Sequence, residues 1–117
     1  MAGEDDETMG LLLFKKVFAE AIVSGGKTTT LRRWDRARCR AGQRVFAPGV
    51  GYLRVRSVER VRLAGLSRED ARADGFGSVR SLRRTLAGMY SGAGRAKPLW
   101  RVEFEFEGPP GGRLGSR

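Results

Sequence analysis

The residues best suited to catalysis and anion binding lie in one short segment, residues 25–33, which reads Gly-Gly-Lys-Thr-Thr-Thr-Leu-Arg-Arg. The segment combines a lysine, three hydroxyl groups and two guanidinium groups, which are suited to general-base, nucleophilic and anion-binding roles. Glycine ends helices without strain and β-branched threonine favours strands, so we expect Lys27 at a corner between a helix and a strand. Thr30 and Arg32 then share one strand face. We expect the ligand of this protein to bind here.

The same segment contains Gly-Lys-Thr at residues 26–28, which is the end of a phosphate-binding loop, with Ala21 where that motif has its first glycine. A phosphate-binding loop leaves a strand and opens a helix, so that backbone N–H groups face the phosphates. Here the order is reversed, because the segment follows a helical pattern and precedes a strand. The chain also lacks an apolar strand that ends in Asp and holds magnesium. The sequence therefore argues against a nucleoside triphosphatase.

Positive charge dominates the composition. The 117 residues include 23 Lys and Arg against 13 Asp and Glu and no His, which gives a formal net charge of +10. Arginine-rich codons would explain arginine in place of lysine, but not the excess of bases over acids. A field of this size attracts polyanions, and nucleic acid is the usual partner. We expect RNA, a nucleoside or a nucleotide as the ligand of a monomeric protein.

A single cysteine, Cys39, rules out an intramolecular disulfide and a zinc site of the Cys and His type. We therefore expect no metal and no cofactor. The N-terminus is acidic where a secretory signal is basic, and the apolar run at residues 11–13 is too short for a signal core or a membrane span. These features indicate a cytoplasmic protein that does not contact a membrane.

Periodicity predicts the elements that must position residues 25–33. We expect a disordered acidic N-terminus at 1–9, one folded domain at 10–107 and a flexible Gly, Pro and Arg tail at 108–117. Within the domain we expect strands at 11–13, 28–32, 45–47, 51–63 and 100–106, and helices at 14–22, 67–75 and 78–90. The strand at 11–13 is expected to be short and buried, and apolar residues alternate with charged ones along 100–106. The apolar residues at helical spacing in the first helix, which we expect to face the core, are Phe14, Val17, Phe18, Ala21 and Ile22. The alternation slips between Ser57 and Val61, which indicates a bulge. The sum is an α+β domain with a small curled sheet or partial barrel and helices beside it.

Several segments, taken in this order, resemble the ASCH domain family. They are Gly-x-Lys-x-x-x-x-Arg at 25–32, Gly-Gln-Arg-Val at 42–45, Val-Glu-Arg-Val at 58–61, Leu-Ser-Arg-Glu-Asp-Ala at 66–71 and Asp-Gly-Phe-Gly-Ser at 74–78. The resemblance covers roughly residues 10–106. It implies a PUA-like β-barrel of about five or six strands with two or three helices. It also implies that the first helix lies beside a cleft that binds RNA or other nucleic acid; some members of the family are enzymes.

Thr30 occupies the position where the usual family signature, Gly-x-Lys-x-x-Glu-x-Arg, has Glu. A small bacterial branch of the family with a Lys-Thr-x-Thr-x-Arg segment hydrolyses the amide of acetylated cytidine, and residues 27–32 are similar to it. The branch uses the lysine, the second of these threonines and a later glutamate. Carried over, these residues are Lys27, Thr30 and Asp74. Asp in place of Glu retracts the carboxylate by about one C–C bond, roughly 1.5 Å.

Two functions follow from these residues. The first is binding of RNA in a basic cleft around residues 25–33, because binding demands less accurate placement than catalysis does. Its expected contacts are phosphate binding by lysine and arginine, base stacking by aromatic rings and a row of strand arginines. The residues are Lys27, Arg32, Arg33, Trp34, Tyr52, Arg54 and Arg56. Ordinary packing of the two rings, and a soluble sheet edge for the strand arginines, remain open alternatives.

The second function is an amidohydrolase that acts on acetylated cytidine. Lys27 would be the general base, Thr30 or a water the nucleophile, and Asp74 would orient the base or protonate the leaving amine. Backbone N–H groups near Gly25 and Gly26, or the Arg32 guanidinium, would stabilise the oxyanion. In an ideal strand Lys27 and Thr30 point to opposite faces, so the corner at Gly26 must turn Lys27 toward the cleft. The alternative for Asp74 is a purely structural role, in which it caps the turn at residue 75.

Overall fold

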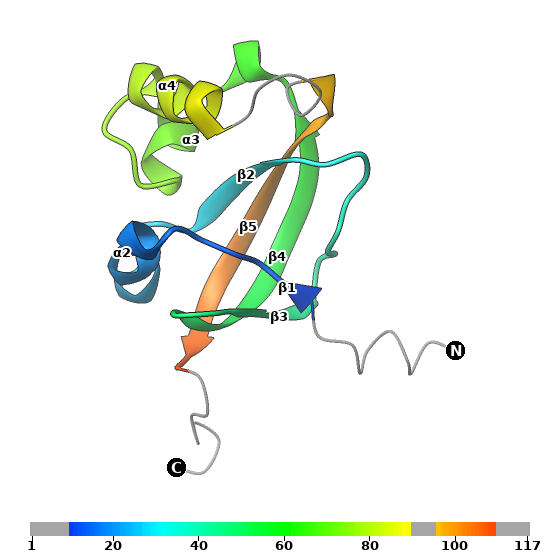
Figure 1. The fold of residues 1–117 in the computed structure, drawn as a ribbon, viewed down its shortest axis with the longest axis vertical. Coiled ribbons are helices and arrows are strands. Elements are labelled where there is room, and N and C mark those ends of the chain that lie inside the picture. Colours follow the sequence, from blue (N-terminus) through cyan, green and yellow to red (C-terminus); the bar gives the residue numbers. More distant parts are fainter. Residues whose placement is uncertain (1–9, 90–95, 110–117) are drawn as a thin grey trace.

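A curled five-stranded sheet forms the body of the computed structural model, which describes residues 10–89 and 96–109. Its strands are β1 (Gly10–Leu11), β2 (Thr29–Arg33), β3 (Arg44–Ala47), β4 (Gly51–Val61) and β5 (Leu99–Gly108). The strand order is β1-β3-β4-β5-β2, with β1 parallel to β3 and the other neighbours antiparallel. The long strands β4 and β5 run side by side across the whole sheet (Figure 1). β2 is therefore an edge strand.

Three α-helices accompany the sheet in the described part of the chain: α2 (Ala19–Ser24), α3 (Arg68–Ala73) and α4 (Val79–Met89). Single 3-10 turns, η1 (Lys16–Phe18) and η2 (Leu63–Gly65), precede α2 and α3. Figure 1 shows α3 and α4 together at one end of the sheet and α2 on the same side, with β2 passing between them. This confirms an α+β, PUA-like small barrel with the predicted numbers of strands and helices. None of the described helices is long and apolar enough to cross a bilayer.

The first helix differs from the prediction, which began it at Phe14. Lys15 is extended, with φ −64° and ψ 144°, and the chain makes a 3-10 turn before α2 begins at Ala19. The 3-10 turn has about three residues per turn rather than 3.6, so the side-chain directions differ from those of an α-helix. Val17, predicted to face the core, is 75% exposed, whereas Phe18 packs against the core.

Three smaller predictions are also corrected by the structure. The run at residues 11–13 is not a buried strand, because only Leu12 is buried while Leu11 and Leu13 are 62% and 63% exposed. The register of β4 against β5 shifts between Val55 and Ser57, slightly before the predicted place, and again near Tyr52. Gly108, assigned to the flexible tail, ends β5. Residues 1–9 and 110–117 lie outside the described residues.

Apolar side chains form two clusters, one on each side of the edge strand β2. The first includes Ile22, Val45, Leu53, Val102 and Phe104 and joins α2 to the curled sheet. The second joins α3 and α4 to β2 and β5 through Leu31, Leu66, Ala71, Leu82, Leu86 and Leu99. Burial of this kind contributes roughly 25 cal/mol per Å² of apolar surface. The two clusters hold the helices at fixed positions around β2.

The corner between α2 and β2 forms as predicted. Gly25 is left-handed, with φ 90°, and its N–H donates to Ile22 O at 3.2 Å. The N–H groups of Gly26 and Lys27 both donate to Ala21 O, at 2.8 and 3.0 Å. Because β2 begins only at Thr29, the alternation of side-chain directions along the strand does not fix the direction of the Lys27 side chain.

Candidate functional site

A cavity of about 300 Å³ lies at the edge of β2, between the segment that enters α2 and the helices α3 and α4. Its lining residues come from the ranges 13–18, 27–32, 74–76 and 82–86. Lys27, Thr30 and Asp74, which the sequence predicted as catalytic, all line this cavity, and so does Arg32. The corner at Gly26 thus turns Lys27 to the same cavity as Thr30, as the sequence required.

Lys27 is buried, with 2% of its surface exposed. Its Nζ donates to Thr29 O and to Asp74 O, both at 3.0 Å, and forms an ion pair with the Asp74 carboxylate. It also lies 4.8 Å from the centre of the Phe18 ring. An ammonium has three N–H donors and a neutral amine only two. The three N–H donors of an ammonium match these three partners, so the geometry fits a Lys27–Asp74 ion pair.

Asp74 follows the last residue of α3 and is 4% exposed. Its backbone N–H donates to Asp70 O at 3.1 Å, while its backbone carbonyl and its carboxylate both accept from Lys27. The adjacent Ala73 carbonyl accepts from Thr28 N at 2.6 Å. The end of α3 is therefore fixed to the corner before β2. Asp reaches Lys27 directly despite being shorter than Glu, and it pairs with Lys27 rather than capping the turn at residue 75.

Burial moves the two pKa values of this pair toward each other. Desolvation lowers the pKa of Lys27 below its ordinary 10.5, and the charge and hydrogen bond of Asp74 oppose that shift. Desolvation likewise raises the pKa of Asp74 above its ordinary 3.8, against the opposing attraction of Lys27. The neutral pair is thus closer in free energy to the ion pair than it would be in water.

Thr30 and Arg32 lie side by side on β2, because residues two apart share a strand face. The Arg32 Nε donates to the Thr30 Oγ1 at 3.0 Å, and Thr30 is 5% exposed. One Nη of Arg32 donates to Leu13 O at 2.6 Å, and the guanidinium carbon lies 4.9 Å from the Phe14 ring centre. A fixed positive charge is therefore held beside the Thr30 hydroxyl.

The backbone N–H groups of Gly25 and Gly26 do not point into the cavity as oxyanion donors. Both are already used by the end of α2, where they donate to Ile22 O and Ala21 O. This corrects the expectation that these glycines would stabilise an oxyanion. Of the two groups predicted for that role, the Arg32 guanidinium is the one that borders the cavity.

Aromatic and aliphatic side chains form most of the remaining lining, to which Lys15 and Thr85 also contribute. Phe18 and Phe76 meet edge to face with ring centres 6.2 Å apart, and Phe14 lies close by. Leu82 and Leu86 line the cavity from α4. Sequence reasoning assigned Phe14 and Phe18 to the core because they occur at helical spacing, and it did not single out Phe76. The signal that could have identified Phe76 is the Asp-Gly-Phe motif at 74–76, which places this ring two residues after Asp74.

Arg33 and Trp34, predicted to bind nucleic acid, are engaged elsewhere. An Arg33 Nη donates to Lys97 O at 2.9 Å. Trp34 is 8% exposed and belongs to the first apolar cluster, and its carbonyl accepts from Trp100 Nε1 at 3.1 Å. Little of the Trp34 ring is open to a base.

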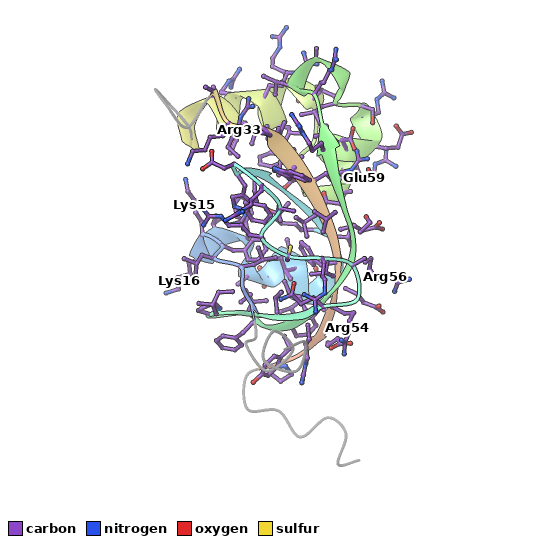
Figure 2. All side chains as sticks on the ribbon, turned by 90° about the vertical axis from the view of Figure 1, so that its right-hand side faces the viewer. Lys15, Lys16, Arg33, Arg54, Arg56 and Glu59 are labelled. Atoms are coloured by element: carbon purple, nitrogen blue, oxygen red, sulfur yellow. The ribbon has the colours of Figure 1, made fainter. Side chains whose placement is uncertain are left out.

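Tyr52, Arg54 and Arg56 also lie outside the cavity. Tyr52 contacts the Phe46 ring at 5.2 Å between centres. Arg54 pairs with Glu107 at 3.1 Å, and Arg56 with Glu105 at 2.7 Å, across the β4–β5 ladder. In Figure 2 the two arginines lie along β4, opposite the side that carries Lys15, Lys16 and Arg33. The cavity therefore gathers Lys27, Thr30, Arg32 and Asp74 from the predicted residues, and leaves out the other five.

Within residues 10–89 and 96–109, no cluster of His, Cys, Asp and Glu is arranged to hold a metal ion. Cys39 is buried, and burial raises the pKa of its thiol to about 11.

No family model and no curated protein sequence matches this chain. Among solved structures, the hypothetical protein PH0355 superposes with a TM-score of 0.72 at 15% identity, over 84% of this chain and 98% of its own. An ASCH domain from Lactobacillus crispatus gives a TM-score of 0.64 at 13% identity, over 89% and 82%. A mutant ASCH protein from Zymomonas mobilis gives 0.59 at 18% identity, over 86% and 70%. These superpositions establish a shared fold, and at identities this low they establish the fold alone.

Proposed function

On the premise that this chain has the ASCH-domain fold, we propose that it is an amidohydrolase that removes the acetyl group from acetylated cytidine nucleosides. One observation carries the proposal. Lys27, Thr30 and Asp74, the residues that correspond to those of the amide-hydrolysing branch, line a single cavity although Asp74 lies far from the other two in sequence. A nucleophile, a base and an acid in one cavity are what amide hydrolysis requires.

The proposed reaction begins from the ion pair. Transfer of a proton from Lys27 to Asp74 leaves a neutral amine, which accepts the proton of the Thr30 hydroxyl directly or through one water. The Thr30 oxygen adds to the acetyl carbonyl, and the resulting oxyanion lies near the Arg32 guanidinium. Asp74 then donates its proton to the departing cytidine amine, so the C–N bond breaks and the Lys27–Asp74 ion pair is restored.

The acetyl–Thr30 ester is hydrolysed by the same cycle. Lys27, after passing its proton to Asp74 again, takes a proton from water, and the hydroxide adds to the ester carbonyl. Asp74 returns its proton to the Thr30 oxygen, which releases acetic acid and regenerates the starting state. The pKa shifts support this scheme, because burial favours the neutral form of both groups.

Cavity size and lining favour a nucleoside as substrate. A volume of about 300 Å³ is at the lower end of small-molecule sites, which span roughly 300–1,000 Å³. The rings of Phe14, Phe18 and Phe76 offer apolar faces and edges to a planar base. Four polar side chains of the lining are joined in pairs, Lys27 with Asp74 and Arg32 with Thr30.

The test is release of cytidine from N4-acetylcytidine by the purified protein, followed by chromatography. Thr30→Val keeps the side-chain shape and removes the hydroxyl, so turnover should fall at least about a hundredfold. Thr28→Val makes the same change two residues away at a position that does not line the cavity, and should leave turnover within about twofold. Equal loss in both variants would contradict a nucleophilic role for Thr30.

Binding of single-stranded RNA is the second candidate, favoured by the basic surface beside the cavity. Lys15 lines the cavity and is exposed. The next residue, Lys16, is also exposed (Figure 2). Together with the net charge of +10 these residues attract a phosphate backbone. The arginine pairs on β4 do not add to this surface, because their charge is balanced by glutamates on β5.

A further inference from the structure

The backbone N–H and C=O groups of Leu31 point away from the sheet. In the antiparallel pairing of β2 with β5, Phe104 N donates to Thr28 O at 2.9 Å and Trp34 N donates to Pro98 O at 3.0 Å. Hydrogen-bonded pairs recur at every second residue of such a ladder. Thr30 and Arg32 therefore bond to β5, and Leu31, opposite Arg101, does not. Because β2 is the last strand of the sheet, the N–H and C=O of Leu31 face its open edge.

The cavity extends past this edge. Thr30 and Arg32 lie on one face of β2, while the Leu31 side chain lies on the other face and packs in the second apolar cluster. All three residues line the same cavity. A cavity that meets both faces of an edge strand must pass along its edge. The backbone groups of Leu31 therefore face the cavity.

Leu31 is the one residue of this edge whose backbone offers both a donor and an acceptor to the cavity. The carbonyl of Thr29, the preceding outward residue, accepts from Lys27 Nζ at 3.0 Å. Arg33, the next outward residue, does not line the cavity. Backbone polar groups that are shielded from water and left unpaired are costly. The site is thus prepared for a ligand that supplies the complementary acceptor and donor.

We propose that the Leu31 backbone recognises the hydrogen-bonding edge of a pyrimidine, with the Leu31 N–H donating to a ring nitrogen or carbonyl and the Leu31 C=O accepting from an amino or imino N–H. A single planar ring fits a cavity of about 300 Å³ lined by three phenylalanines. This inference rests on the proposed function for the choice of cytidine. In cytidine the ring N3 accepts and the exocyclic N4–H donates, which brings N4 next to Thr30, the adjacent residue.

Nuclear magnetic resonance of the ¹⁵N-labelled protein tests the inference at the amide itself. On addition of cytidine, the Leu31 amide resonance should shift and its exchange with solvent should slow by about tenfold or more, because its N–H gains an acceptor. The matched control is the Arg33 amide, which points outward on the same strand but lies outside the cavity. If cytidine shifts amides around Phe18 and Lys27 while Leu31 stays unchanged, the inference is overturned.

Matched nucleosides test the same bonds from the ligand side. N4,N4-dimethylcytidine lacks the N4–H and should bind about tenfold or more weakly than cytidine, because the Leu31 carbonyl loses its donor. 5-Methylcytidine carries a methyl away from this edge and should bind within a few-fold of cytidine. Equal affinity of cytidine and the dimethyl compound contradicts the inference.

These measurements separate the failure of this inference from the failure of the proposed function. Turnover of N4-acetylcytidine with no response at Leu31 would overturn the recognition and leave the hydrolysis standing. A Leu31 response to cytidine without turnover would support the recognition and remove the hydrolysis. A Leu31 response to an extended peptide but to no nucleoside would assign the edge to strand addition instead and overturn the inference.

Discussion

Lys27 and Asp74 lie 47 positions apart in sequence and bind each other through two contacts, since both the carboxylate and the backbone carbonyl of Asp74 accept from Lys27 Nζ. The pair joins the corner before β2 to the end of α3. It is buried on both sides, with side-chain exposures of 3% and 5%. A proton donor and a proton acceptor are thereby held as one unit on the wall of the cavity.

The first prediction concerns the stability of this pair. Lys27→Met should lower the free energy of unfolding by about 3–5 kcal/mol, because it leaves the Asp74 carboxylate buried without a partner. The double variant Lys27→Met with Asp74→Leu should recover most of that loss, because it removes both charges. Urea unfolding at pH 7 of the three proteins is the measurement. Losses that simply add in the double variant would show that the two residues do not act as a pair.

The second prediction concerns the pKa of Lys27. Its midpoint, followed by ¹³C resonance of the Lys27 Cε, should lie below 10.5 because burial disfavours the ammonium. Asp74→Asn should lower the midpoint further, because the carboxylate raises the pKa of Lys27 through its charge and hydrogen bond. A midpoint that rises in Asp74→Asn would contradict the pairing.

The same shift has a consequence for stability, which gives a third prediction. Because the Lys27 pKa is lower in the folded than in the unfolded chain, the unfolded chain binds more protons between the folded value and 10.5. Lys27 therefore makes the free energy of unfolding rise with pH across that window. Wild-type protein should show a steeper rise than the Lys27→Met, Asp74→Leu double variant, which keeps all other charges. Parallel curves would speak against a lowered pKa.

Local pattern was sufficient for much of the fold. The alternation through β5 is confirmed, with Val102 and Phe104 buried and Glu103 and Glu105 exposed. Gly25 ended the first helix where its left-handed conformation is needed. The start of that helix was wrong because the spacing of its apolar residues does not distinguish an α-helix from a 3-10 turn at Val17. The outward direction of the Val17 side chain is seen only in the structure.

The site was predictable only in part, for a physical reason. Nothing in the spacing of Lys27 and Asp74 shows that they meet, since α3 and the corner are joined by tertiary packing. The resemblance to a family supplied that link. The positions of Arg54 and Arg56 depended on their partners across the ladder, Glu107 and Glu105, which strand order decides. The open edge at Leu31 likewise follows from strand order and not from local sequence.

The fourth prediction concerns RNA. Lys15→Ala with Lys16→Ala should weaken binding of single-stranded RNA and lower the slope of log affinity against log salt by about 1.4, since each phosphate contact contributes about 0.7. The matched control, Arg54→Ala with Arg56→Ala, removes the same charge from residues that are paired with glutamates. It should change the slope less. Filter binding at several salt concentrations gives both values, and a larger effect in the control would place the RNA on β4 instead.

Turnover of N4-acetylcytidine by the intact protein and by two variants, Lys27→Met and Asp74→Asn, tests the proposed reaction. The wild-type protein should release cytidine and acetate in equal amounts. Both variants should lose at least about a hundredfold in rate, because one lacks the base and the other cannot carry the proton. Release of no cytidine by folded wild-type protein, or turnover unchanged in Lys27→Met, would contradict the proposed reaction.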